Sequence, residues 1–257
     1  MKLRLLPSSF QVDGSASNLQ HLTSFLIDGR VAIDAGSLAL SLSAEERTQI
    51  RDIVLTHSHL DHTAALPLFI DDQFSEIREP IRIYASPAVI DVLETHIFNW
   101  LVYPRFSEIE NSFGKIIEYR PIDDRPFAIE KLRLSPLPVN HRVPSYGFVV
   151  EDSMAAIAIT GDTADMDEFW RRLSDFQHLV ALLIECAFPD ELGDLAALSH
   201  HLTPSRLARE LEKFHLEDCP VYVINMKPAY RNRISQQLTE LGIERLRKLE
   251  VGKIYEF

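Results

Sequence analysis

The stretch that decides the fold runs Ile53-Val54-Leu55-Thr56-His57-Ser58-His59-Leu60-Asp61-His62. A short apolar run leads directly into three imidazoles and one carboxylate, which are side chains that bind divalent metals. Alternation along an extended chain points His57 and His59 the same way, and a helix starting after them projects Asp61 and His62 toward a second position. One segment can therefore supply two ligands to each of two metal ions. The alternative, a solvated histidine-rich loop, is disfavoured directly after a buried strand.

Four more apolar runs end in side chains that bind metal or move protons. Those ends are Asn140-His141, Gly161-Asp162-Thr163, Glu185 and Asn225-Met226-Lys227. Short β-rich runs and amphipathic helical stretches alternate over the whole chain, which favours an α/β layered sandwich over a purely parallel sheet. The strand ends then line one edge of that sandwich with metal ligands.

Local signals place several elements along the chain. Turn chemistry at Asp28-Gly29 predicts a hairpin that pairs residues 24–27 with 31–33. Other strands are expected at 53–55, 81–84, 148–150, 156–159, 182–184 and 221–224. Helices are expected from Ser86-Pro87 to about Leu101, from Thr203-Pro204 to about Phe214, and from about Asn232 to Leu241. With no repeat and no low-complexity linker, the sequence predicts a single domain over 1–257.

Composition excludes several classes of protein. Hydrophobic residues at 46% and charged residues at 25% are the balance of a globular protein rather than a disordered one. The net charge of −12 argues against long nucleic acid as a partner, whereas a small anionic substrate fits if metals reverse the local field. With only Cys186 and Cys219, disulfide scaffolds and thiolate clusters are excluded. No apolar run is long enough to cross a membrane and none reads as a signal peptide, so the expected location is the cytoplasm.

The histidine motif and the residues after it, His57 to Leu68, resemble the metallo-β-lactamase superfamily, and within it the class II 3′,5′-cyclic-nucleotide phosphodiesterases. Further marks of that branch resemble Ile33-Asp34-Ala35-Gly36, His141 ahead of Ser145-Tyr146-Gly147-Phe148, Gly161-Asp162-Thr163, Glu185-Cys186-Ala187-Phe188 and His201-Leu202-Thr203-Pro204. The resemblance covers about residues 14 to 230. It implies an αββα four-layer sandwich with a dinuclear metal site on one edge of its two sheets.

The resemblance also implies ligands for two divalent ions, which would be zinc, manganese or iron. The first ion would be held by His57, His59 and His141, and the second by Asp61, His62 and a bridging Asp162. Asn225 departs from the pattern, because the branch has histidine before its Lys-Pro. Its amide oxygen is a weaker and harder ligand that suits manganese or iron better than zinc. Either Asn225 holds the second metal loosely, or it only caps a turn.

The implied activity is hydrolysis of a 3′,5′-cyclic nucleotide such as cAMP to the 5′-monophosphate, with a metal-bridging hydroxide attacking phosphorus. The catalytic candidates are Asp61, Glu185 and His201, with Glu185 orienting His201 so that its imidazole protonates the departing sugar oxygen. Two candidates for phosphate binding are Thr203, at the start of a helix, and Lys227.

Three alternatives stay open. A transfer-RNA 3′-processing ribonuclease of the same superfamily shares the metal motif, but no basic, glycine-rich insertion for tRNA is visible. A non-catalytic metal-binding or sensor protein is suggested by Asn225. Hydrolysis of a lactone or thioester is the third, because the metal ligands do not choose between carbonyl and phosphoryl centres. A homodimer is also an open expectation.

Overall fold

The computed structural model describes all residues from Met1 to Phe257, and the chain divides into two compact units. The N-terminal unit comprises Lys2–Asp123 and Val251–Glu256, and the C-terminal unit comprises Asp124–Glu250 with Met1 and Phe257. Each unit contains one seven-stranded sheet. Whether the two act as one domain over 1–257 stays a prediction.

The sheet of the N-terminal unit has the order β16-β1-β2-β3-β4-β5-β8. Its antiparallel half pairs the two ends of this unit, since Lys2 lies opposite Glu256, while β3, β4, β5 and β8 run parallel. The predicted hairpin is confirmed, with Phe25 opposite Ile33 and left-handed backbone at Asp28 and Gly29. The strands are β1 (Lys2–Leu5), β2 (Phe25–Ile27), β3 (Val31–Ile33), β4 (Asp52–Val54), β5 (Ile81–Ala85), β8 (Ile117–Pro121) and β16 (Ile254–Glu256), with a separate ribbon of β6 (Glu110–Asn111) and β7 (Gly114–Lys115).

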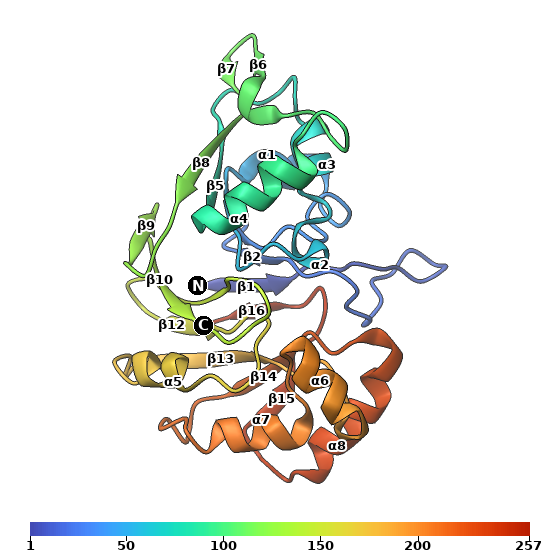
Figure 1. The fold of residues 1–257 in the computed structure, drawn as a ribbon, viewed down its shortest axis with the longest axis vertical. Helices are drawn as coiled ribbons and strands as arrows, with labels where there is room; N and C mark the ends of the chain where they lie inside the picture. The colour runs from blue at the N-terminus through green and yellow to red at the C-terminus, as the bar shows by residue number, and fades with distance from the viewer. The chain divides into compact units, whose positions relative to one another are not determined.

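Four α-helices belong to this unit, and Figure 1 shows α1, α3 and α4 beside β5 and β8. They are α1 (Ala44–Gln49), α2 (Leu60–Thr63), α3 (Leu66–Asp71) and α4 (Pro87–Val92), joined by the π-turn η1 (Leu93–Ile97) and the 3₁₀ turn η2 (Phe106–Glu108). The helix predicted from Pro87 starts as expected, with the Ser86 hydroxyl accepting from the Val89 amide. It ends at Ile97 rather than near Leu101, because the Phe98 side chain is buried in the core and the backbone at Trp100 is left-handed.

The sheet of the C-terminal unit has the order β15-β14-β13-β12-β11-β10-β9. Strands β9 to β12 are antiparallel and β12 to β15 are parallel. Both sheets are therefore mixed, which confirms the expectation that a purely parallel sheet is the wrong architecture. The strands are β9 (Phe127–Ile129), β10 (Leu132–Pro138), β11 (Tyr146–Glu151), β12 (Ala156–Ile159), β13 (Leu179–Glu185), β14 (Val221–Ile224) and β15 (Leu246–Lys248).

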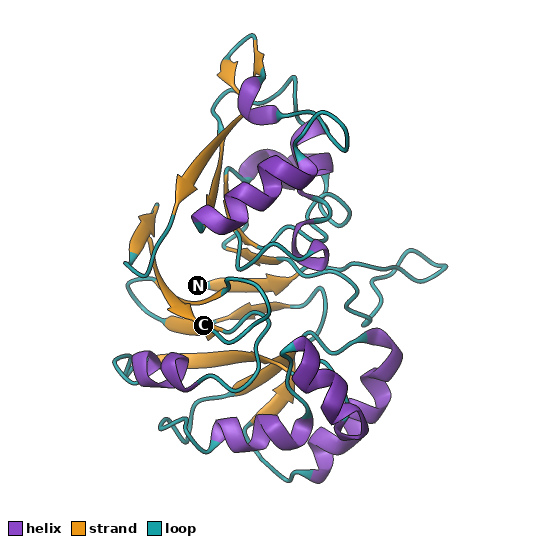
Figure 2. Cartoon of the chain, viewed as in Figure 1, coloured by secondary structure: helices purple, strands orange, loops and turns teal.

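The helices of the C-terminal unit pack their apolar sides on this sheet (Figure 2), and Trp170, Leu207 and Ile234 join Leu182 and Val223 in one buried cluster. Two predicted helices are present, the first three residues shorter than expected at its end. The elements are α5 (Asp167–Leu173), α6 (Gly193–Ser199), α7 (Pro204–Leu211) and α8 (Arg231–Glu240), with 3₁₀ turns η3 (Asp190–Leu192) and η4 (Pro228–Tyr230). No helix of the protein combines the length and the hydrophobicity that a membrane span requires.

Candidate metal centre

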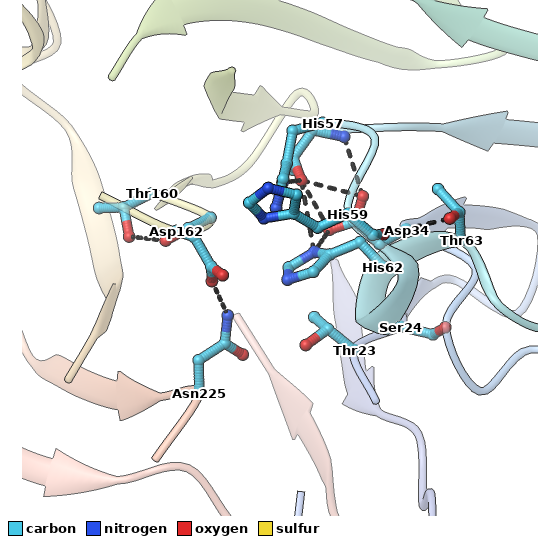
Figure 3. Close-up of polar contacts among 12 residues, drawn as sticks. Thr23, Ser24, Asp34, His57, His59, His62, Thr63, Thr160, Asp162 and Asn225 are labelled. Atoms are coloured by element: carbon cyan, nitrogen blue, oxygen red, sulfur yellow. Dashed lines mark hydrogen bonds and ion pairs between the residues drawn. The ribbon is translucent and has the colours of Figure 1, made fainter. Parts of the chain in front are cut away.

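In the N-terminal unit the histidine motif follows β4 and leads into α2, as its spacing predicts. His59 is the residue before the helix, and Asp61 and His62 lie in the first helical turn. The ring of His57 lies 4.8 Å from that of His59 and 4.1 Å from that of His62, measured between centroids. Figure 3 shows these three imidazoles as one group, and His57 and His62 are fully buried. The strand, turn and helix therefore bring the predicted ligands of this unit together.

A buried carboxylate, Asp34, organises that group. Its side chain accepts a 2.6 Å hydrogen bond from Nδ1 of His62 and also accepts from the amide and hydroxyl of Thr56. Because the Thr56 hydroxyl donates to Asp34, its oxygen accepts from Nδ1 of His57 at 2.9 Å. Both imidazoles thus carry their proton on Nδ1 and offer Nε2 as a metal ligand. Those Nε2 atoms are buried and make no hydrogen bond, which fits a divalent metal.

The turn that carries Asp34 packs against the first turn of α2. The amide of Ala35 donates to the carbonyl of His62, and the amide of Thr23 donates to the carbonyl of Asp61. At Gly36 there is no room for a side chain, because a β-carbon there would lie 2.0 Å from the Asp61 carbonyl oxygen. This glycine is needed for close backbone approach and so fixes where the metal motif sits.

In the C-terminal unit, ligand atoms of His141, Asp162 and His201 lie within 4.8 Å of one another. His141 belongs to the loop after β10, Asp162 to the loop after β12, and His201 to the segment between α6 and α7. Nδ1 of His141 lies 3.0 Å from the carbonyl oxygen of His200. A carbonyl only accepts, so His141 also carries its proton on Nδ1 and offers Nε2 to a ligand. Two imidazoles and a carboxylate suit zinc, manganese and iron.

Glu185 at the end of β13 is fully buried and holds His201. Its Oε1 lies 2.7 Å from Nδ1 of His201 and accepts from the Thr163 amide, while its Oε2 accepts from the amides of Ala187 and Leu202. Burial works against the charged imidazolium, but the charge and hydrogen bond of Glu185 raise the pKa of His201 above its ordinary value. The predicted Glu–His pair is therefore brought together, with the imidazole oriented by the carboxylate.

Three other predicted residues lie in the same unit. Asn225 follows β14 with a left-handed backbone, and its side-chain amide donates a short hydrogen bond to Asp162 (Figure 3). Thr203 is buried directly before α7. Lys227 precedes η4, and its positive charge opposes protonation of His201, which places the ammonium group within electrostatic reach of that imidazole. Their assignment as ligand or substrate contacts stays a prediction.

Sequence reasoning gave no role to Asp34 or Thr56. The signal was available, because Asp34 follows the β3 strand directly, as the other polar residues follow theirs. Its partner His62 lies 28 positions away, so the hydrogen bond between them appears only in the fold.

Sheets of this order, with histidines and carboxylates at the ends of their strands, define a metal-dependent hydrolase of the metallo-β-lactamase type. Residues 24–217 match the family model described as "Beta-lactamase superfamily domain", and the chain belongs to that family. Both the αββα metallo-β-lactamase-type fold and the metal-dependent hydrolase class expected from the sequence are thereby confirmed.

Particular relatives point to the same branch. A protein of Yersinia pestis called a probable 3′,5′-cyclic-nucleotide phosphodiesterase is 29% identical over 232 residues, 77% of this chain and 66% of that protein, slightly less than two thirds of its length. A 3′,5′-cyclic-nucleotide phosphodiesterase of Aliivibrio fischeri is 27% identical, with 89% of this chain and 86% of that protein covered. The crystal structure of unliganded yeast PDE1 matches with a TM-score of 0.72 at 18% identity, covering 98% of each chain. This last likeness shows the fold.

Proposed function

We propose that this metal-dependent hydrolase is a phosphodiesterase that converts a 3′,5′-cyclic nucleotide, such as cAMP, to the 5′-monophosphate. The observation that carries the proposal is the buried Glu185–His201 pair, whose imidazole lies in one group with His141 and Asp162. A charged acid held at that position suits a reaction that expels a poor leaving group. The cyclic-nucleotide phosphodiesterases among the relatives support the same substrate class.

The proposed metal ligands are the imidazoles and carboxylates that both units present. They are His57, His59, Asp61 and His62 from the N-terminal unit, and His141, Asp162 and Asn225 from the C-terminal unit. We assign them to two ions, which are zinc, manganese or iron. Divalent metals, when bound, lower the pKa of a coordinated water to roughly 7 and draw charge from phosphoryl oxygens. They also give a protein of net charge −12 a positive field at its site.

His201 is the proposed general acid. Glu185 holds its Nδ1, so Nε2 is the nitrogen that can reach the substrate. The 3′ oxygen of a ribose is a poor leaving group as an alkoxide and needs a proton as its bond to phosphorus breaks. Protonation by Nε2 of His201 supplies that proton, and the Glu185 carboxylate stabilises the imidazolium before transfer. Asp61, the third catalytic candidate, acts here through its place among the metal ligands.

The phosphate would be held by groups on the same unit. Thr203 precedes α7, whose first amide groups carry partial positive charge that favours an anion. Lys227 supplies a full positive charge near His201. Both belong to the C-terminal unit, which therefore offers the acid and the phosphate contacts together.

A hydrolysis screen tests the proposal. The metal-loaded protein, prepared separately with manganese and with zinc, is offered cyclic mononucleotides, an aryl phosphodiester, a lactone and a tRNA precursor. We expect a cyclic mononucleotide to be opened to the 5′-monophosphate, identified by phosphorus NMR, and a chelator to abolish the reaction. Turnover of only the lactone or only the tRNA precursor contradicts the proposal. Less than one metal ion per chain without any turnover supports the sensor alternative. A cytoplasmic location and a homodimer stay predictions.

A further inference from the structure

His200 occupies an unusual position at the end of α6. Its backbone is left-handed, with φ 56° and ψ 59°, and its amide bonds back to the carbonyl of Ala197. The next amide, of His201, donates to the carbonyl of Ala196 at 2.8 Å. Glycine or asparagine usually fills this position after a helix, because a β-carbon is disfavoured in the left-handed region. A histidine here calls for contacts that hold its backbone in place.

Two contacts of His200 meet the loop that carries His141. The carbonyl oxygen of His200 accepts from Nδ1 of His141 at 3.0 Å, and its ring Nδ1 lies 3.0 Å from Oδ1 of Asn140. The Asn140 amide nitrogen donates to the Asp165 carbonyl, so its oxygen is the atom that faces His200. His200 therefore donates from Nδ1 to Asn140 with its side chain while its backbone accepts from His141.

Asn140 also connects this loop to the one that carries Asp162. Its amide donates to the hydroxyl of Thr163 at 3.2 Å, and its carbonyl accepts from the amide of Ala164 at 2.8 Å. The His200–Asn140 pair thus links three loops. Those loops carry His141, Asp162 and His201, whose ligand atoms form one group.

We infer that His200 is a positioning residue for the metal ligand His141, an inference that rests on the ligand role proposed above. The His200 carbonyl fixes the tautomer and the ring orientation of His141, so that Nε2 faces the metal. The direction of this carbonyl depends on the left-handed backbone, and the hydrogen bond from the His200 ring to Asn140 holds that backbone in place. Loss of such an outer hydrogen-bond partner typically weakens metal binding about 10- to 100-fold.

The experiment measures Zn²⁺ affinity by competition with a chromophoric chelator, and the visible absorption of the Co²⁺-substituted protein. His200→Val forces a β-branched residue into the left-handed region, which swings the carbonyl away from His141. We expect an affinity loss of about 10- to 100-fold and shifted cobalt bands. His200→Gly and His200→Asn tolerate the same backbone, so they should lose several-fold less than the valine variant. Exposed His215 gives the control, since His215→Ala should bind like the unmodified protein.

Two further variants make the outcome decisive. Asn140→Ala removes the anchor of the His200 ring without straining the end of α6, and we expect a smaller loss of Zn²⁺ affinity than in His200→Val. His141→Ala tests the ligand role itself, and unchanged affinity there defeats the proposed site rather than the positioning role. If His141→Ala weakens binding while His200→Val and Asn140→Ala bind normally with unchanged cobalt spectra, the positioning role is overturned. Equal losses in all three His200 variants, in step with their melting temperatures, also overturn it.

Discussion

The side-chain amide of Asn225 donates a hydrogen bond to the carboxylate of Asp162, across 63 positions of sequence. The bond sets a neutral amide against the carboxylate that we propose as the bridge between two metals. The backbone of Asn225 is left-handed, with φ 56°, directly after β14. Histidine also tolerates that region better than most residues, so the position can accept an imidazole.

The substitution Asn225→His should therefore tighten the weaker of two metal sites. Imidazole binds zinc and iron more strongly than a neutral amide oxygen does. We expect about a tenfold gain in affinity, roughly 1.4 kcal/mol, at the second step of a metal titration followed by calorimetry. Asn225→Ala serves as the control that removes the hydrogen bond without adding a ligand. An unchanged titration in the histidine variant would place residue 225 outside the coordination shell.

Asp162→Ala should abolish hydrolysis and lower the metal content. The change removes the carboxylate proposed to bridge the ions, and with it one member of the group formed with His141 and His201. Metal per chain is measured by elemental analysis alongside turnover of a cyclic nucleotide. The exposed neighbour Asp165 provides the matched control, because Asp165→Ala keeps the backbone carbonyl that Asn140 uses. A variant at 162 with most of its turnover rules out a bridging role.

His201→Ala should slow poor leaving groups far more than good ones. An alkoxide leaving from a cyclic nucleotide needs a proton, whereas an activated aryl oxide leaves without one. We expect a loss of about 10²- to 10⁴-fold on the cyclic nucleotide and a much smaller loss on an aryl phosphodiester. The comparison is made on kcat for both substrates, with the exposed residue His178 changed to alanine as the control. Equal losses on the two substrates argue against a proton donor at residue 201.

Sequence alone predicted the parts of this fold that local chemistry decides. The β2–β3 hairpin follows from the Asp28-Gly29 turn, and the start of α4 follows from the Ser86 cap. The pairing of β1 with β16 joins residues at opposite ends of the chain, and neither short strand carries a pattern that names its partner. The early end of the Pro87 helix depends on burial of Phe98, which is a tertiary effect.

The candidate site divides in the same way. Residues that follow strands were found from their types and spacing, including His141, Asp162 and Glu185. Partners that orient them were not found, because they come from other loops: Asp34 for His62, and the His200 carbonyl for His141. A backbone carbonyl leaves no trace in residue type, so no sequence pattern could have revealed the second of these.

Asp34→Asn tests the orienting role in the N-terminal unit. The amide keeps the size of the side chain but loses the charge that holds Nδ1 of His62 at 2.6 Å. We expect metal affinity to fall about 10- to 100-fold, as is typical when an outer partner of a histidine ligand is removed. Chelator competition measures the change. Asp72→Asn removes one partner of a surface ion pair with Arg47 and should leave the affinity unchanged. Normal metal binding by the asparagine variant would show that His62 is held in place without Asp34.

The two cysteines should be slow to react with alkylating reagents in the folded protein. Burial disfavours the thiolate and raises the pKa of Cys219 to about 11, and burial raises that of Cys186 as well. At pH 8 only about one Cys219 side chain in a thousand is then ionised, against roughly a quarter for an exposed thiol of pKa 8.5. We expect labelling by iodoacetamide to accelerate about tenfold per pH unit between pH 8 and 10, while urea releases two fast sites at pH 8. Cys219→Ser isolates the slower thiol, Cys186. Mass spectrometry counts the labels, and two rapid additions to the native protein at pH 8 would mean that both thiols are accessible.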